Sequence, residues 1–235
     1  DQGSVRLSDT VIDCHTPREA LEHGIGMVYQ EMLSFPNLTV SGNIFAGREV
    51  TTPLGRLDEA AMYTRTKELL ARLHVPAAPD TPMDSLSAAH AQLIQVARAL
   101  AFDCRVLVLD EPTTSLTDAE VDHLFEVVTT LKGSGVTILF VSHRLPEVYR
   151  LCDRITVLRD GGHVGTFDRA TTTPDDIVRA MVGREPPVRS ARVVPPSGGV
   201  PALKVRGLSR GTAFSDISFE VAKGEILGLV GESGC

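Results

Sequence analysis

Three short apolar runs, each followed at once by polar residues, constrain the fold of this 235-residue chain more than any other feature. They span residues 25–29, 106–109 and 136–141. Runs of this length and composition predict strands of a parallel sheet that is covered on both faces. Because the carboxyl ends of parallel strands share one edge, the polar residues that follow are expected to meet there, where open α/β sheets bind their ligands.

A helix is predicted between the last two runs. Thr117-Asp118-Ala119-Glu120 has the pattern of a capping box, and Gly133 is expected to end the helix. One helical face collects the apolar residues Val121, Leu124, Phe125, Val128 and Leu131. Strand, helix and strand in this order predict a right-handed crossover, which places both strands in one parallel sheet.

Further helices and a hairpin are predicted around this sheet. Residues 57–100 favour successive helices, one of them capped by Asp58, with apolar positions at Met62, Leu69, Leu70 and Leu73. Two strands, 155–158 and 164–167, predict a hairpin around the turn Asp160-Gly161-Gly162. Thr173 and the proline after it then open a short helix that ends near Gly183.

The distribution of proline and glycine predicts two units joined by a linker. The first covers residues 1–183, with a helical part at about 45–102, and the linker covers residues 184–200. The second unit, 201–235, is predicted to contain strands at 203–208, 214–221 and 226–230, the last buried and running into a glycine-rich turn. We expect the chain to be a fragment cut at both ends, since it has no initial Met and stops within that turn.

Composition excludes several classes of function. With 43% hydrophobic and 23% charged residues the chain is expected to fold.

Its 23 Lys and Arg against 30 Asp and Glu give a net charge of −7, which disfavours nucleic-acid binding. No apolar run approaches the ~20 residues of a membrane span, the first residues given lack the charged-then-apolar pattern of a signal peptide, and the chain is expected to stay in the cytosol. The four cysteines show no paired C-x-x-C spacing, so neither zinc nor a disulfide framework is indicated.

The strongest chemical signal is the pair of carboxylates, Asp110 and Glu111, that ends the run at 106–109. Because unpaired buried carboxylates are very costly, both are expected to face a ligand or a cation. Consecutive residues of a strand point to opposite sides, so the two acids are expected to act differently. In nucleoside-triphosphate hydrolysis the first would help to hold Mg²⁺ and the second would orient or deprotonate water. The alternative is that both acids cap the next turn or pair with an arginine.

Two more polar groups follow the other runs. Ser142 and His143 end the run at 136–141, where a polar side chain is able to reach a phosphate oxygen. Gln30 directly follows the first run. A neutral amide at this position would meet a cation or the attacking water without adding charge. A lone histidine at a strand end is more often structural, and glutamine caps many loops, so the position of both residues beside Asp110 and Glu111 carries the argument.

Ser87 is placed to cap a helix that runs from about residue 88 to residue 100. The free N–H groups and the positive dipole end of such a helix are able to bind a phosphate. The alternative is an ordinary capped helix.

Taken in order, these segments resemble the motifs of ATP-binding-cassette (ABC) ATPases. The Q-loop, signature, Walker B, D-loop and H-loop are matched by Gln30, 86–92, 109–113, 115–118 and 142–144. Residues 24–31, 38–49 and 181–184, with a proline-containing linker into another cassette, are similar to the tandem-cassette ATPases of ribose, galactose and xylose importers. The resemblance implies an α/β P-loop NTPase-like cassette, incomplete, with a parallel sheet core, a helical subdomain and the first strands of a second cassette.

The resemblance also implies roles for single residues. Asp110 would assist Mg²⁺ binding, Glu111 would be the general base, and His143 would contact the γ-phosphate of ATP. Gln30 would sense the cation and couple to the membrane subunit. The residues expected to contact nucleotide, those of the signature acting on the opposing cassette, are Ser87, Ala88, Ala89, Gln92, Asp118, Gly231, Glu232, Ser233, Gly234 and Cys235.

Two departures from the family pattern stand out. No Gly-x-x-x-x-Gly-Lys-Ser/Thr occurs in the 235 residues, so these residues alone are expected to bind ATP poorly and to hydrolyse little. The signature has Ala88 and Ala89 where the family usually has glycines, and each Cβ is expected to hinder the approach of a phosphate.

The resemblance predicts an ATPase that powers sugar import at the cytoplasmic face of the membrane. Its cofactors would be ATP and Mg²⁺, and its partners membrane permease subunits, a second cassette and, indirectly, a sugar-binding protein outside the membrane. Two alternatives stay open: a regulatory cassette that binds nucleotide without hydrolysis, and an ABC ATPase that does not serve transport.

Overall fold

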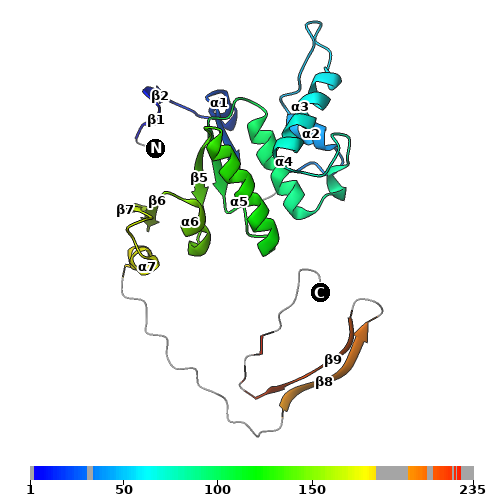
Figure 1. The fold of residues 1–235 in the computed structure, drawn as a ribbon, viewed down its shortest axis with the longest axis vertical. Coiled ribbons are helices and arrows are strands. Elements are labelled where there is room, and N and C mark those ends of the chain that lie inside the picture. The colour runs from blue at the N-terminus through cyan, green and yellow to red at the C-terminus, as the bar shows by residue number, and fades with distance from the viewer. Residues whose placement is uncertain are drawn as a thin grey trace. The chain divides into compact units, whose positions relative to one another are not determined.

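The computed structural model describes residues 3–30, 34–183, 201–210, 214–223, 225, 227 and 228. The chain divides into two compact units, with the boundary between Met181 and Val182, and each unit is considered by itself (Figure 1). Among the described residues, no helix combines the length and the apolar character that crossing a bilayer requires.

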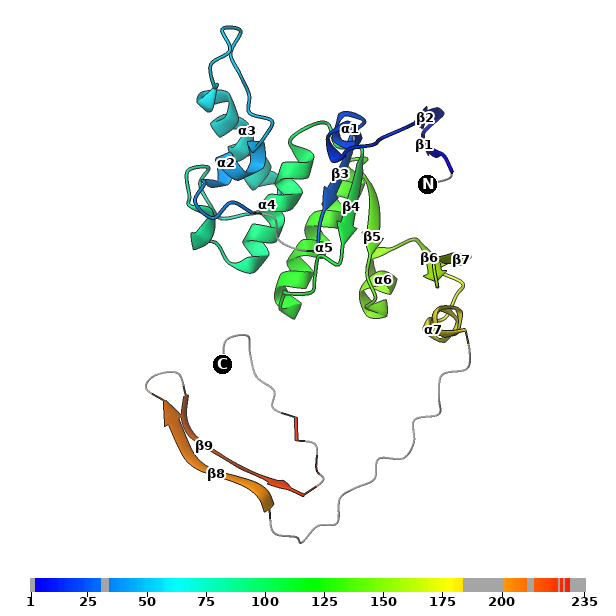
Figure 2. The same cartoon turned by 180° about the vertical axis from the view of Figure 1, so that it is seen from behind.

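The first unit is built on a parallel sheet of three strands: β3 (Ile25–Val28), β4 (Val106–Asp110) and β5 (Thr137–Val141). Their order in the sheet is β3-β4-β5, and Figure 2 shows them from the side opposite to α5. The three apolar runs therefore form the predicted parallel strands, with their carboxyl ends at one edge. The prediction that both faces of the sheet are covered is wrong for β5, where Leu139 is 55% and Val141 is 44% exposed.

Helix α5 (Asp118–Gly133) connects β4 to β5 across one face of the sheet, which Figure 1 shows from the front. Its capping box is present as predicted, with Glu120 accepting the Thr117 N–H at 2.8 Å, and the predicted apolar face is buried. The helix includes Gly133, and Gly135, with φ of +93°, is the residue that adopts the left-handed conformation after it. The predicted crossover is confirmed, and its terminator lies two residues later.

Between β3 and β4 the chain is helical, as predicted. It forms α2 (Val40–Phe45), α3 (Glu59–Arg72), the 3-10 turn Met83–Ser85 and α4 (Ala88–Leu100). Asp58 caps α3 by accepting the N–H of Ala61 at 2.9 Å, and the inner face of α3 buries Met62 and Leu70. Helix α2 was not predicted, because six residues are too few to show a helical period.

Helix α6 (Leu145–Leu151) follows β5, and the predicted hairpin comes next as β6 (Arg154–Arg159) and β7 (Gly162–Asp168). Asp160 and Gly161 both have positive φ, which is the turn geometry that favours a two-residue hairpin connection. Helix α7 (Pro174–Val182) is the predicted short helix.

At the start of the first unit, the strands β1 (Val5–Leu7) and β2 (Thr10–Ile12) form a small antiparallel pair. Helix α1 (Pro17–Glu22) follows and contacts β3. None of these three elements was predicted. The strands contain three residues each, too few to show an alternation of apolar and polar side chains.

The described residues of the second unit form an antiparallel hairpin, β8 (Pro201–Arg210) paired with β9 (Phe214–Ala222), which confirms the two predicted strands. The predicted buried strand at 226–230 is not supported by its described residues. Leu227 and Gly228 lie outside any strand, and Leu227 is 39% exposed. A two-stranded hairpin offers no second layer that could bury such a side chain. The predicted linker, 184–200, lies outside the described residues.

Candidate functional site

Polar side chains from three neighbouring strands meet at the carboxyl edge of the sheet. Glu111 lies between the other two: one carboxylate oxygen, Oε2, accepts a hydrogen bond from Gln30 Nε2 at 3.2 Å. The other, Oε1, lies 2.9 Å from His143 Nδ1. The three residues follow β3, β4 and β5 respectively, so the sheet brings together groups that are up to 113 positions apart, the difference between 143 and 30.

The hydrogen bonds of Glu111 fix the proton on His143. An ionised carboxylate only accepts hydrogen bonds, so Nδ1 of the imidazole carries a proton and donates it to Glu111. In the neutral ring, Nε2 is then the acceptor. The side chain of His143 is 68% exposed and that of Glu111 is 24% exposed, which makes the histidine the more accessible member of the pair.

The backbone of Glu111 adopts a conformation that glycine favours. Its φ is +45°, in the left-handed region, where other residues cost of order 1–3 kcal/mol. Three hydrogen bonds hold it there: its N–H donates to the carbonyl of Val141 at 2.9 Å, and its carbonyl accepts from the Thr114 hydroxyl at 3.0 Å and from the Thr114 N–H at 3.4 Å. Strain of this kind persists where the surroundings enforce it, and it is common where a side chain must be aimed at a ligand.

Asp110 is the last residue of β4 and lies beside Val141 of β5 in the register of the sheet. It is partly buried, next to the carboxylate of Glu111 in sequence. No group of three or more His, Cys, Asp or Glu side chains suited to a metal occurs among the described residues. Mg²⁺ commonly takes one or two carboxylates and completes its shell with phosphate oxygens and water. Asp110 offers one such carboxylate at this edge of the sheet.

The predicted helix cap is present at α4: Ser87 Oγ accepts the N–H of His90 at 3.3 Å. Ser87 is exposed, Ala88 is partly exposed, and Ala89 and Gln92 are buried at 8% and 4% exposure. In the described part of the chain, no hydrogen bond joins these residues to Glu111. Among the described residues, hydrogen bonds thus link Gln30, Glu111 and His143 to one another and none of them to the predicted signature residues.

The remaining predicted nucleotide contacts lie elsewhere. Asp118 is exposed at the first turn of α5. Gly231, Glu232, Ser233, Gly234 and Cys235 lie outside the described residues.

Two residues behind the cluster were not singled out from the sequence. Glu147, in the first turn of α6, is buried and accepts a hydrogen bond from the buried hydroxyl of Thr113 at 2.7 Å. An acid in the first turn of a helix is usually an exposed group that favours the helix dipole, so its position did not signal burial. No signal in the sequence marks its burial, because its partners meet only after β4 and β5 have paired.

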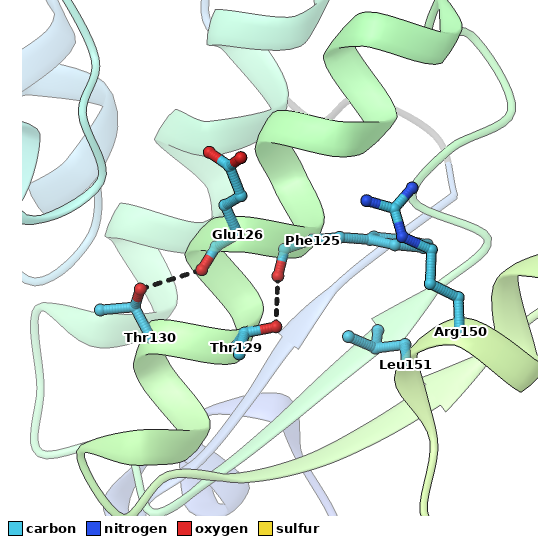
Figure 3. A pocket seen from close by; sticks show the side chains of 6 residues that line it. All are labelled: Phe125, Glu126, Thr129, Thr130, Arg150 and Leu151. Atoms are coloured by element: carbon cyan, nitrogen blue, oxygen red, sulfur yellow. Dashed lines mark hydrogen bonds between the residues drawn. The ribbon is translucent and has the colours of Figure 1, made fainter.

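A hollow of about 320 Å³ lies between α5 and α6, away from the predicted residues (Figure 3). Arg150 crosses it with its guanidinium 5.0 Å from the centre of the Phe125 ring. The hydroxyls of Thr129 and Thr130 donate to carbonyls of their own helix, at 2.7 and 2.9 Å. Since these polar groups are already satisfied, the hollow adds no reactive group to the site.

Comparison with known proteins decides the family. A model described as ABC transporter matches residues 1–114. The ribose import ATP-binding protein RbsA 1 of Streptomyces coelicolor is 44% identical over 235 residues, which is 100% of this chain and 46% of that protein. The chain belongs to the ABC transporter ATP-binding family. The galactose/methyl galactoside import ATP-binding protein MglA 1 of Photobacterium profundum is 39% identical over 238 residues. That match covers 100% of this chain and 47% of the Photobacterium protein.

Solved structures show the same fold. A nucleotide-free ATP-binding cassette from an ABC transporter matches with a TM-score of 0.63 and 21% identity, over 78% of this chain and 74% of that chain. A dimeric post-hydrolysis cassette bound to ADP and Pi matches with a TM-score of 0.60 and 20% identity. The match covers 72% of this chain and 74% of that chain. The predicted α/β cassette fold is confirmed. This chain spans about half the length of the curated relatives that it matches.

Proposed function

We propose that this chain is part of the ATP-hydrolysing subunit of a sugar importer. The contact of Gln30 and His143 with the two oxygens of Glu111 carries the proposal, because it assembles a base and two polar groups at one sheet edge. The relatives that match the whole chain are named as ribose and galactose import ATP-binding proteins, which supports sugar as the cargo.

In this proposal Glu111 is the general base. Its carboxylate accepts a proton from the attacking water once that water replaces one of its present partners. His143 contributes an exposed imidazole beside Glu111, and a ring N–H of that imidazole would donate to an oxygen of the γ-phosphate, which only accepts hydrogen bonds. Gln30 senses the cation through its amide oxygen while its Nε2 bonds Glu111.

Asp110 is the residue proposed to hold Mg²⁺, with Gln30 as a second oxygen donor. The cation would neutralise charge on the β- and γ-phosphates when bound. Asp110 ends its strand with a partly buried carboxylate, so one protein carboxylate is positioned for that ligand set.

The helix cap at Ser87, with Ala88, Ala89 and Gln92, is proposed to close over nucleotide held by another cassette. Asp118 and residues 231–235 complete the proposed nucleotide contacts. Exposure of Ser87 at the N-terminus of a 13-residue helix supports a role toward another molecule, because its side chain and the helix dipole face outward.

We further propose permease subunits as direct partners, a sugar-binding protein as an indirect partner, and the cytoplasmic face of the membrane as the location. The domain division proposed is a first cassette at 1–183 with its helical part at about 45–102, a linker at 184–200, and the start of a second cassette at 201–235. The boundary between the two compact units, after Met181, supports this division.

The decisive experiment measures Mg²⁺-dependent ATP hydrolysis by the full-length protein that contains residues 1–235. Glu111→Gln is made in a version whose other cassette is inactivated, so that only this site contributes. Loss of a general base lowers kcat by roughly 10²- to 10⁴-fold. Glu126→Gln, an exposed acid of α5, is the matched control and should leave kcat unchanged. Equal turnover in Glu111→Gln and its parent would remove Glu111 from this role.

A second candidate function is a cassette that binds nucleotide and does not hydrolyse it. Ala88 and Ala89 favour it, since a Cβ at each position crowds the helix N-terminus where a phosphate would approach. Retained ATP binding together with a rate of ATP turnover that Glu111→Gln does not change would support this function. Failure of the full-length protein to co-purify with any membrane subunit would favour an ABC ATPase outside transport.

A further inference from the structure

We propose that Glu147 is a positioning residue that holds His143 against Glu111 by tying together the two loops that carry them. The inference rests on the proposed function, because the pair that it positions is the proposed hydrolytic pair. It concerns a carboxylate behind the site, which lies too deep to reach a nucleotide itself: the side chain of Glu147 is 7% exposed.

Burial of this acid requires an explanation. Glu147 lies in the first turn of α6, where a glutamate ordinarily reaches water and favours the helix dipole. A carboxylate that is removed from water is stable only when other groups replace its hydration. Those groups are cations and hydrogen-bond donors. The partners of Glu147 come from two different loops, and their identity shows what the carboxylate does.

The first partner comes from the loop after β4. The hydroxyl of Thr113, itself 2% exposed, donates to Glu147 Oε2 at 2.7 Å. Thr113 lies two residues after Glu111, with the buried Pro112 between them. Because proline restricts the backbone, a constraint on Thr113 is transmitted to the segment that aims Glu111.

The other partners come from the loop after β5 and flank His143 on both sides. Arg144 Nη1 lies 2.5 Å from Glu147 Oε1, and the two groups form an ion pair. Oε1 is buried and accepts no hydrogen bond of good geometry. The hydroxyl of Ser142 donates to Oε2 at 3.4 Å and accepts the N–H of Arg144 at 3.0 Å. His143 is thus the exposed middle residue of a turn whose two neighbours face one buried carboxylate.

These contacts explain how an exposed histidine keeps a defined position. Its side chain is 68% exposed and has little packing of its own to fix it, yet its Nδ1 lies 2.9 Å from Glu111. Removing the Glu147 charge leaves Arg144 without its buried partner and loosens the turn. Since a misplacement of about 1 Å can cost a reaction about 10²-fold, a small shift of His143 is enough to lower kcat.

The test uses the full-length protein with its other cassette inactivated, and the variants Glu147→Gln, Thr113→Val and Thr113→Ser. Glu147→Gln keeps the shape of the side chain and removes its charge, while Thr113→Ser keeps the hydroxyl that Thr113→Val removes. We expect kcat to fall roughly 10-fold or more in Glu147→Gln and Thr113→Val, within the range a small misplacement produces, with KM for ATP changed by less than about 3-fold. Thr113→Ser should retain most of the activity. Glu59→Gln, an exposed first-turn acid of α3, is the matched control and should leave kcat unchanged.

A double-variant cycle separates positioning from mere support of the fold. If Glu147 acts through His143, Glu147→Gln should lower kcat in the parent and have little further effect in a His143→Ala background. An equal fall in both backgrounds, or an unchanged kcat in the parent, overturns the proposal.

Hydrogen exchange gives a readout that does not depend on hydrolysis. Backbone amides of residues 142–144 should exchange faster in Glu147→Gln than in the parent, whereas those of α3 should not change. Unchanged exchange at 142–144 contradicts the tie between the loops. A parent protein that hydrolyses no ATP defeats the proposed function, and the exchange result still decides whether Glu147 holds the turn.

Discussion

A single buried amide, that of Asn43, fixes the loop that leads into α2. Its Oδ1 accepts the N–H of Phe35 at 2.8 Å, and its Nδ2 donates to the carbonyls of Phe35 and Thr39, both at 3.0 Å. Asn43 is 2% exposed, so its polar atoms depend on these partners rather than on water. Asparagine is a poor residue for a helix interior, and here its bonds to the preceding loop compensate for that preference.

Asn43→Ala is therefore expected to destabilise the first unit by about 2–4 kcal/mol, because it leaves several backbone groups of the loop without partners. The measurement is the shift of the unfolding transition of the full-length protein in urea. Asn37→Ala, an exposed asparagine of the same loop, serves as control and should stay within about 0.5 kcal/mol of the parent. Equal effects of the two substitutions would show that the hydrogen bonds of Asn43 contribute nothing to stability.

Single residues differ in how far the sequence predicts them. Gln30, Glu111 and His143 were predictable because each follows an apolar run, and a parallel sheet aligns the ends of its strands. The left-handed backbone of Glu111 was not, since it arises from the hydrogen bond to Val141 on the neighbouring strand. The burial of Glu147 has the same origin: its partners meet only after β4 and β5 have paired.

At the scale of elements, the close approach of β3 and α4 depends on Gly26. A Cβ built at Gly26 would lie 2.8 Å from the Cβ of Ala99 and 3.1 Å from the Sγ of Cys104. A side chain at position 26 could therefore be accommodated only if the strand and the helix moved apart. Because β3 also carries Gln30 to the sheet edge, displacement of β3 changes the site as well as the core.

Gly26→Ala is expected to cost about 1–3 kcal/mol, the range found when a methyl group is forced into a packed core. It should also lower ATP hydrolysis by moving Gln30. Gly133→Ala is the matched control: its Cβ would meet nothing within 4 Å, and alanine in a helix is favoured over glycine, so stability should stay unchanged or rise by up to about 1 kcal/mol. The measurement is the urea midpoint of both variants, and destabilisation by Gly133→Ala equal to that by Gly26→Ala would contradict the packing argument.

Elements were predictable where the pattern was long enough to repeat. Helix α5 has 16 residues and a capping box, and it matched the prediction except at its end. The strands β1 and β2, with three residues each, and the six-residue α2 gave no period to read. Helix α2 is fixed by its neighbours instead: the Thr39 hydroxyl caps it, and Pro82, from the turn before α4, forms a β-bridge with Thr39.

At the scale of the molecule, two capping boxes make the stability of the chain depend on pH. Hydrogen bonds from the backbone and hydroxyl of Thr117 hold the pKa of Glu120 below its ordinary value of 4.5. The Thr173 hydroxyl and backbone N–H lower the pKa of Asp176 below 3.8 in the same way, at the start of α7. Both acids bind protons more weakly in the folded chain than in the unfolded chain.

The direction of the effect follows from that difference. A group with a lowered folded pKa adds stability that is fully present above its unfolded pKa and is lost as the pH falls through its folded pKa. Stability from the two caps is therefore present above the ordinary pKa values of 4.5 for Glu120 and 3.8 for Asp176, and it is lost as the pH falls below them through the lowered values. With a net charge of −7 at pH 7, protonation of the other carboxylates changes the electrostatics over the same range, so the caps must be isolated by variants.

The double variant Glu120→Gln/Asp176→Asn should have a lower Tm than the parent at pH 7 and a smaller loss of Tm between pH 6 and pH 3, because it has no cap charge to lose. Glu126→Gln/Asp175→Asn removes the same two charges from exposed neighbours on the same helices and should follow the parent across the range. The measurement is thermal unfolding of the full-length protein at constant ionic strength. If both double variants lose the same Tm as the parent on acidification, the acid sensitivity comes from overall charge and the caps have no part in it.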